Sequence, residues 1–191
     1  MAIFSTTKAL TGTALMQLVE EGKVRLGDAA RKYVPEIAEL QVLDGFDAAG
    51  QPKTRAPKRD ITVNDLILHT SGLCYEFFSH DDLKYRTAKG IPTVVSSTFP
   101  SIRTVLLHDP GAAWTYGVNI DWLGRIVEQQ RGKRLGEVMK ERIFTPLGMQ
   151  DIAFNMSDSM KSRRALLPFM DAVAYPGFVD FEAAVHRSVK N

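Results

Sequence analysis

The chain has 191 residues, of which 45% are hydrophobic and 24% are charged. This length and near-average composition predict one globular domain, or one and a fraction, and argue against disorder, a collagen-like repeat or a coiled coil. Lys and Arg number 24 against 22 Asp and Glu, and the net charge of +2 is too small to favour capture of a nucleic acid. The single cysteine, Cys74, excludes an intrachain disulfide framework and a thiolate zinc cluster.

Membrane-directed segments are not expected from the sequence. No apolar run approaches the roughly 18–20 residues that a membrane span needs. The first residues, Met1 to Phe4, do not begin a basic and then apolar leader. We therefore expect no membrane partner and a cytoplasmic location, unless a longer gene product carries an upstream signal.

The strongest predicted element is a helix over residues 6–21. Its apolar residues recur at three- and four-residue steps, which is typical of a helix that buries one face. Ser5 or Thr6 is a suitable N-cap, and Gly22 is a suitable residue to end the helix.

The remaining elements follow from turn residues and apolar periodicity. They are an extended piece at 24–26, a helical stretch from 28 to before Pro35, a surface loop at 44–60, a short helix through Leu68 opened by a Thr62–Asp65 capping box, a helix and then a loop over 75–100, and helices at 101–107, 119–130 and 135–144. Few alternating strands are present, so the sequence predicts a mostly helical chain.

Ser5-Thr6-Thr7-Lys8 is a Ser-x-x-Lys sequence at the start of the first predicted helix. Helix geometry places Lys8 one turn after Ser5 on the same face, and the helix N-terminus favours a developing negative charge. Serine is a weak nucleophile that needs an adjacent base, and a lysine serves as that base only where its pKa is lowered. The alternative is a Ser N-cap followed by a solvated lysine, because this pattern occurs about once by chance in a chain of this length.

Four further strings follow the Ser-x-x-Lys sequence in a fixed order. They are Leu68-His69-Thr70-Ser71-Gly72-Leu73, Asp109-Pro110-Gly111-Ala112-Ala113-Trp114-Thr115-Tyr116, Leu123-Gly124, and Thr145-Pro146-Leu147-Gly148-Met149. This order and spacing resemble the serine β-lactamase-like superfamily, which includes class C β-lactamases, D-alanyl-D-alanine carboxypeptidases and family VIII carboxylesterases. The resemblance runs from about Phe4 to Asp151.

The resemblance implies roles for three residues. Ser5 matches the acylated nucleophile, Lys8 its general-base partner, and Tyr116 the tyrosine that moves protons between nucleophile and leaving group. Which of Lys8 and Tyr116 takes the first proton is left open. The alternative for Tyr116 is a half-buried aromatic residue after a turn. His69 is interpreted as structural, at a helix end before a Ser-Gly turn.

The string after Tyr116 favours an esterase over a lactamase or peptidase. Family members that act on amides usually carry a small residue and then Asn after this tyrosine, whereas this chain has Gly117 and then Val118, with Asn119 one place later. Loss of a polar clamp is expected to harm amide substrates more than esters. We therefore assign Val118 to substrate binding, with the closest likeness to the family VIII carboxylesterases.

The family's third motif, a Lys-Thr-Gly, His-x-Gly or Trp-x-Gly on a late strand, is not found in its expected place. Trp122-Leu123-Gly124 has matching letters but lies in the predicted helix after Tyr116. The resemblance thus implies an α+β fold of which this chain holds the mostly helical portion, with most of the antiparallel sheet missing and with truncation at both ends. We expect a partial hydrolase domain at 1–156 and a divergent tail at 157–191, of which residues 166–191 resemble no part of the family.

The predicted function is a serine carboxylesterase that hydrolyses short-chain esters through an acyl-enzyme at Ser5. Whether the chain is an active enzyme is left open, because a missing oxyanion-hole donor lowers rates by about 10²–10³. One alternative is a catalytically impaired remnant that needs a partner, either a complementing chain or a second copy. A weaker alternative is a β-lactamase or D-alanyl-D-alanine carboxypeptidase.

No cofactor or metal is expected. His80, Asp81 and Asp82 are adjacent, but no second cluster lies at ligand spacing. Cys74 is interpreted as a small buried residue rather than a nucleophile.

Overall fold

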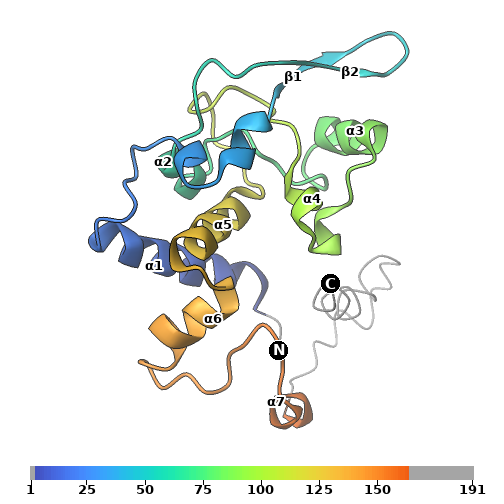
Figure 1. The fold of residues 1–191 in the computed structure, drawn as a ribbon. Helices are drawn as coiled ribbons and strands as arrows, with labels where there is room; N and C mark the ends of the chain where they lie inside the picture. The colour runs from blue at the N-terminus through green and yellow to red at the C-terminus, as the bar shows by residue number, and fades with distance from the viewer. Residues whose placement is uncertain (1–2, 164–191) are drawn as a thin grey trace.

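The structure is a computed structural model that describes residues 3–163, in which helices dominate an α+β arrangement (Figure 1). The elements in chain order are η1 (Phe4–Thr6), α1 (Thr7–Glu20), η2 (Ala30–Lys32), η3 (Pro35–Glu39), β1 (Val42–Phe46), β2 (Pro52–Arg55), α2 (Val63–Ile67), α3 (His80–Lys89), η4 (Val94–Ser96), α4 (Phe99–Ile102), α5 (Asn119–Arg131), α6 (Leu135–Met139), η5 (Lys140–Phe144) and α7 (Asp158–Ser162). The predicted segment 166–191 lies outside the described residues, as do 164 and 165.

Helices α1 and α5 pack against each other at the centre of the molecule, with α6 beside them (Figure 1). The predicted apolar stripe of α1 is confirmed, because Ala14, Leu15 and Leu18 are fully buried. Helix α5 buries the predicted Trp122-Leu123-Gly124 string, and the Trp122 indole N–H donates to the Ile102 carbonyl at 3.1 Å. The helices thus form one apolar core.

Several shorter predictions are also confirmed. Thr62 and Asp65 form the capping box that begins α2, with the Asp65 N–H donating to Thr62 Oγ1 at 3.1 Å. The segment 75–100 holds a helix, α3, followed by a mostly irregular stretch. Residues 135–144 are helical throughout, although the last turn is a π-helix.

The prediction of a loop over residues 44–60 is wrong for residues 44–46 and 52–55. Strands β1 and β2 form an antiparallel hairpin that projects from the top of the molecule (Figure 1). Asp47 closes its turn, because Oδ1 accepts from the N–H groups of Ala49 and Gln51 at 2.9 and 2.8 Å. β2 is mostly polar and β1 contains Asp44 and Gly45, so neither strand shows the regular apolar alternation that marks a strand in a sequence, and backbone pairing holds them together.

The helix predicted at 101–107 is also wrong, because α4 ends at Ile102. Leu106 instead lies extended between Val42 and Leu73, and it accepts from the Leu43 N–H at 2.8 Å. Val105 and Leu106 are fully buried in this extended conformation, not on the face of a helix. The helical stretch predicted from residue 28 is two separate 3₁₀ turns, η2 and η3.

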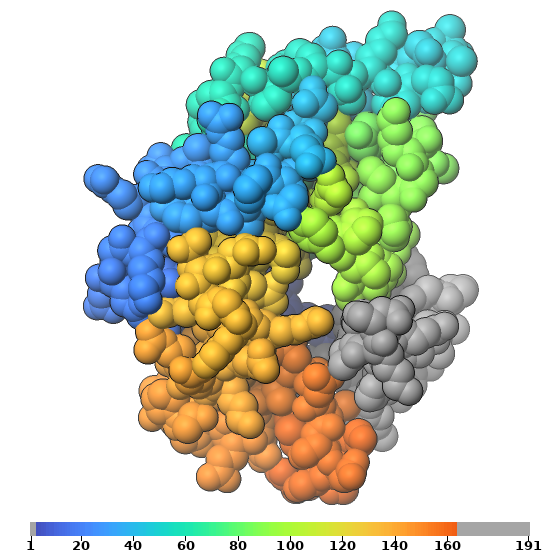
Figure 2. Space-filling view, in the orientation of Figure 1, coloured from blue at the N-terminus to red at the C-terminus, as the bar shows by residue number. Residues whose placement is uncertain are grey.

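Within residues 3–163 the hairpin is the only sheet, in agreement with the expected helical portion of a larger α+β fold. Figure 2 shows the hairpin and α3 along the upper right edge of the molecule, with α6 in the lower part. No helix in this part of the chain combines the length and the apolar composition that crossing a membrane requires.

The start of α5 depends on a close approach between two backbones at Gly117. A Cβ at this position would overlap the Leu73 carbonyl oxygen and the Cys74 backbone. We predict that Gly117→Ala lowers the free energy of unfolding by about 1–3 kcal/mol, because neither backbone can move without disturbing the core. Urea unfolding followed by circular dichroism measures this change.

Gly12, in the middle of α1, supplies the matched control. A Cβ at this position would meet no other atom within 4 Å. Gly12→Ala is expected to raise the free energy of unfolding by about 0.5–1 kcal/mol through helix propensity. Equal effects of the two substitutions would contradict the close approach at Gly117.

Candidate active site

The structure brings Ser5, Lys8 and Tyr116 together. Ser5 Oγ accepts a hydrogen bond from Lys8 Nζ at 3.2 Å and another from the Tyr116 hydroxyl at 3.0 Å. Ser5 and Tyr116 are 111 residues apart in the chain, and the packing of α1 on α5 joins them. These distances suit proton transfer to and from a serine hydroxyl.

Ser5 lies in the 3₁₀ turn η1, directly before α1. The sequence predicts that Ser5 or Thr6 caps the first helix. This prediction is wrong, because no side chain accepts a capping hydrogen bond at the start of η1 or of α1. The Ser5 hydroxyl instead faces Lys8 and Tyr116. Phe4, the residue before it, has a φ of +40°, a strained value of the kind that clusters at functional sites.

Lys8 lies half-buried between two tyrosine rings. Its Nζ is 5.1 Å from the centre of the Tyr116 ring and 5.6 Å from that of Tyr75. Burial lowers the pKa of Lys8, but the Tyr116 and Tyr75 hydroxyls outweigh this effect and leave the pKa above its ordinary value. Lys8 is therefore an ammonium ion at neutral pH rather than a free amine.

Tyr116 has the opposite shift. Burial raises the pKa of its hydroxyl, but the hydrogen bonds that it shares with Ser5 and Lys8, together with the Lys8 charge, outweigh burial and lower it. A cation beside a phenol stabilises the phenolate, and this is the physical cause. The pair therefore combines a cation with a phenol that ionises more readily than usual.

Salt bridges and backbone hydrogen bonds fix the loop that presents Tyr116. Asp109 accepts from both terminal nitrogens of Arg55 at 2.9 and 2.8 Å, and it also accepts from the Lys58 N–H at 3.0 Å. Gly111 has a φ of +83° and leaves room only for the Arg59 guanidinium, which a Cβ would overlap. Its N–H donates to the Thr70 carbonyl at 2.7 Å.

His69 lies against Tyr116, a placement that the sequence analysis did not predict. The ring centres are 4.8 Å apart, and the Thr115 N–H donates to the His69 carbonyl at 2.8 Å. Burial and then the Lys8 charge lower the pKa of His69 to about 4. The sequence gives no signal of this contact beyond the His-Thr-Ser-Gly string, which is consistent with a structural role.

Val118 and Asn119 both have fully buried side chains. Val118, which the sequence assigns to substrate binding, is in the apolar core against which Tyr116 packs, and its exposed fraction is 0%. Asn119 is bound to Ser71, His69 and the carbonyls of Leu73 and Thr115. Neither side chain reaches out as a polar clamp for a substrate amide.

Exposed aromatic residues adjoin Tyr116, and the sequence did not single them out as site residues because they lie in segments without periodicity. Phe77 and Phe78 are 61% and 66% exposed, and Trp114 is 66% exposed. Phe78 and Trp114 each contact Tyr116, with ring centres 6.2 Å apart in both pairs. An apolar surface therefore adjoins the serine.

The remaining sequence candidates lie elsewhere. Asp82 is fully buried and accepts from Arg86 Nε at 2.6 Å and from Thr104, so it faces other protein groups. Across residues 3–163, no group of three His, Cys, Asp or Glu side chains is arranged to hold a metal ion. Cys74 is buried, and burial raises the pKa of its thiol.

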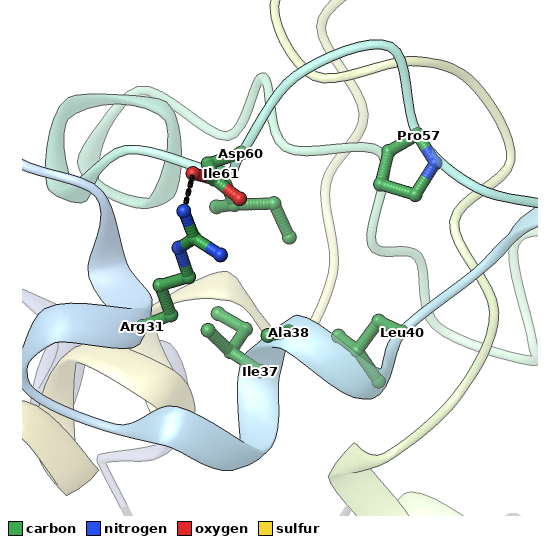
Figure 3. Close-up of a pocket in the computed structure, with 7 residues that line it drawn as sticks. All are labelled: Arg31, Ile37, Ala38, Leu40, Pro57, Asp60 and Ile61. Carbon is green, nitrogen blue, oxygen red and sulfur yellow. Dashed lines mark ion pairs between the residues drawn. The ribbon is translucent and has the colours of Figure 1, made fainter.

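A small pocket between η3 and the segment 57–61 shares no residue with the serine site (Figure 3). Its volume is about 30 Å³, and the Arg31–Asp60 ion pair at 3.0 Å lies on its wall. This space holds about one water molecule, so it is too small for an ester substrate.

Comparisons with known proteins agree with this geometry. A family model described as Beta-lactamase matches residues 1–184. The chain is 40% identical over 165 residues to the acyltransferase mokF of Monascus pilosus, covering 84% of this chain and 40% of that protein. It is 37% identical over 157 residues to a lovastatin esterase of Penicillium rubens, covering 78% of this chain and 38% of that one.

The fold has similar solved structures. A simvastatin synthase from Aspergillus terreus (the LovD6 mutant) superposes with a TM-score of 0.75 at 37% identity, covering 84% of this chain and 38% of that one. The chain thus spans about 40% of the length of the relatives that it matches. Since the family model covers nearly the whole chain and the serine, lysine and tyrosine meet in space, this chain belongs to the beta-lactamase family of serine hydrolases and acyltransferases.

Proposed function

We propose that the protein containing this chain cleaves esters through an acyl-enzyme formed on Ser5. The observation that carries the proposal is that Ser5 Oγ lies within hydrogen-bond distance of both Lys8 Nζ and the Tyr116 hydroxyl. A nucleophile that shares a hydrogen bond with a base held in place by a third group is the general arrangement for covalent catalysis.

Tyr116 is the base in this proposal, and Lys8 is the cation that stabilises its phenolate. The Tyr116 phenolate takes the Ser5 proton as Oγ bonds to the ester carbonyl carbon. The carbonyl–alkoxy bond then breaks, and the leaving alkoxide receives the proton from Tyr116. Support comes from the opposite pKa shifts, which favour an ammonium at Lys8 and a phenolate at Tyr116.

The preference for esters rests on the residues after Tyr116. The Val118 and Asn119 side chains are fully buried, so neither provides the amide clamp that lactam and peptide substrates use. An ester needs fewer hydrogen bonds and has a better leaving group, so the loss affects it less. This favours a carboxylesterase acting on short-chain esters over a β-lactamase or D-alanyl-D-alanine carboxypeptidase.

We predict that Ser5→Ala abolishes the burst of p-nitrophenol released from a short acyl p-nitrophenyl ester. Tyr116→Phe removes only the phenolic oxygen and is expected to slow acylation by about 10²–10⁴, the range for loss of a general base. Stopped-flow absorbance measures both, with Thr6→Ala as the control, because Thr6 is exposed beside Ser5. An undiminished burst in Ser5→Ala would sink the mechanism.

A fluorophosphonate probe separates this proposal from that of an inactive remnant. The expected result is a covalent adduct at Ser5, located by mass spectrometry and lost on heat denaturation. A folded chain without any adduct would mean that the motifs record ancestry, and that residues from the rest of a longer protein or from a partner are required.

The rate is expected to have an acid limb and an alkaline limb. The midpoint of the acid limb is expected below pH 10, the ordinary pKa of a tyrosine. Tyr116 must lose its proton to act as the base, and its pKa is lowered. The alkaline limb lies above pH 10.5, because Lys8 must keep its proton and its pKa is raised. Lys8→Met is expected to move the acid limb up toward pH 10, and Lys8→Arg to remove the alkaline limb. The pH dependence of kcat/KM, corrected for spontaneous hydrolysis of the ester, measures both limbs. An acid limb at the same pH in Lys8→Met as in the wild type would contradict the assignment of Tyr116 as the base.

A second candidate is acyl transfer to an alcohol instead of water. It is favoured by similarity to the acyltransferase mokF and to a simvastatin synthase, and by the exposed aromatic surface of Phe77, Phe78 and Trp114 beside the serine. The acyl-enzyme is common to both functions, so only the acceptor differs.

We predict that an added apolar secondary alcohol diverts the acyl group from acid to ester product. Chromatography of the products at increasing alcohol concentration measures this partition. Phe78→Ala is expected to lower the ester share at least threefold while the burst from Ser5 stays, with the exposed Phe154→Ala as a matched control. Release of acid alone at all alcohol concentrations would favour the esterase, and nitrocefin turnover above ester turnover would favour a lactamase.

A further inference from the structure

We propose that Asn119 is a positioning residue that holds His69 as a neutral imidazole, protonated on Nε2, with its ring against the catalytic Tyr116. The consequence for the reaction rests on the proposed function of Ser5, whereas the state of His69 does not. Asn119 acts from the first turn of α5, and its side-chain hydrogen bonds go to Ser71, His69 and the carbonyls of Leu73 and Thr115.

The orientation of the Asn119 amide is fixed by groups that can act in only one way. The carbonyls of Leu73 and Thr115 lie 3.3 and 3.4 Å from Nδ2, and a carbonyl oxygen can only accept. Nδ2 must therefore be the amino group. The Ser71 hydroxyl completes the arrangement by donating to Oδ1 at 2.6 Å, and Ser71, Leu73 and Asn119 are all fully buried.

This orientation determines where the His69 proton lies. Nδ2 of Asn119 is 3.0 Å from His69 Nδ1, so the amino group donates and Nδ1 accepts. A nitrogen that accepts carries no proton, and the neutral ring then carries its proton on Nε2. Protonation of Nδ1 would break this hydrogen bond and leave two donors facing each other.

Two titratable groups face the imidazole. Tyr116 lies against it in the loop before α5, and Lys8 acts on it from α1. A positive charge on His69 would oppose the charge of Lys8 and would give Tyr116 a second cation. Asn119 keeps His69 neutral and so prevents this second charge. Lys8 is then the one cation that we assign to stabilising the Tyr116 phenolate as Tyr116 exchanges a proton with Ser5.

Nitrogen-15 NMR of histidine side chains in the 191-residue chain tests the proposal directly. The expected spectrum shows His69 protonated on Nε2 only. His108 is an internal reference with the opposite form, because its Nδ1 lies 2.9 Å from the Asp109 carbonyl and its Nε2 lies 2.8 Å from the Thr115 hydroxyl. A proton on Nδ1 of His69, or rapid averaging between the two nitrogens, would overturn the proposal.

Asn119→Asp tests the cause. A carboxylate in place of the amide accepts from Nδ1, so we expect the His69 pKa to rise from about 4 to 6.5 or above, with the proton moved to Nδ1. Asn64→Asp makes the same change at an exposed position of α2 and is expected to leave His69 unchanged. Asn119→Leu is the second variant if Asn119→Asp does not fold. It removes the amide donor to Nδ1, so its expected effect is averaging of the His69 proton between the two ring nitrogens. An unchanged His69 in both variants would contradict the role of Asn119.

The catalytic consequence has a separate measurement. In Asn119→Asp we expect the acid limb of the kcat/KM profile to move to lower pH, because a protonated His69 places a second positive charge against Tyr116 and further stabilises its phenolate. We also expect a new limb at the raised His69 pKa in the pH profile. A changed His69 with an unchanged profile would overturn the catalytic consequence alone, and a wild-type chain without acylation would overturn the proposed function while the NMR result decides the state of His69.

Discussion

The packing of α1 on α5 is the constraint on which the site depends. Ser5 and Lys8 are at the start of α1, and Tyr116 directly precedes α5, so a slip between the helices would separate the hydrogen bonds at 3.0 and 3.2 Å. Gly124 also lets α6 pack closely against α5, because a Cβ there would lie only 3.0 Å from Leu135. The same apolar burial that stabilises the core therefore also sets the geometry of the reacting groups.

Buried and half-buried ion pairs hold the two irregular segments that carry the tyrosines. Asp109 with Arg55 fixes the loop before Tyr116, and Arg86, which pairs with Asp82, also lies 3.6 Å from Glu76, the residue after Tyr75. Burying charged groups has a desolvation cost that such pairs often only offset, so their net contribution to stability is small. Their directional hydrogen bonds instead give the segments one conformation, which apolar contacts alone do not ensure.

The sequence predicts what periodicity and capping encode. The apolar stripe of α1, the Thr62–Asp65 capping box and the meeting of Ser5 with Tyr116 were all accessible, the last through resemblance to a family. The hairpin was not, because its strands pair through backbone groups that every residue has. The contact of Asn119 with His69 was also hidden, since one amide among many carries no sign that it is buried against a histidine.

The electrostatics of the site distinguish its two tyrosines. Both rings lie within 6 Å of Lys8 Nζ, yet burial raises the pKa of Tyr75 to about 12, whereas the net effect on Tyr116 is a lowered pKa. Only Tyr116 has a hydrogen bond to Ser5 Oγ, and it is also the more exposed of the two. When the environments of two titratable groups push their pKa values apart, the groups take different roles. Tyr75 then stays a neutral phenol whose ring helps to hold the Lys8 ammonium in place, and Tyr116 is the group that gains and loses the proton.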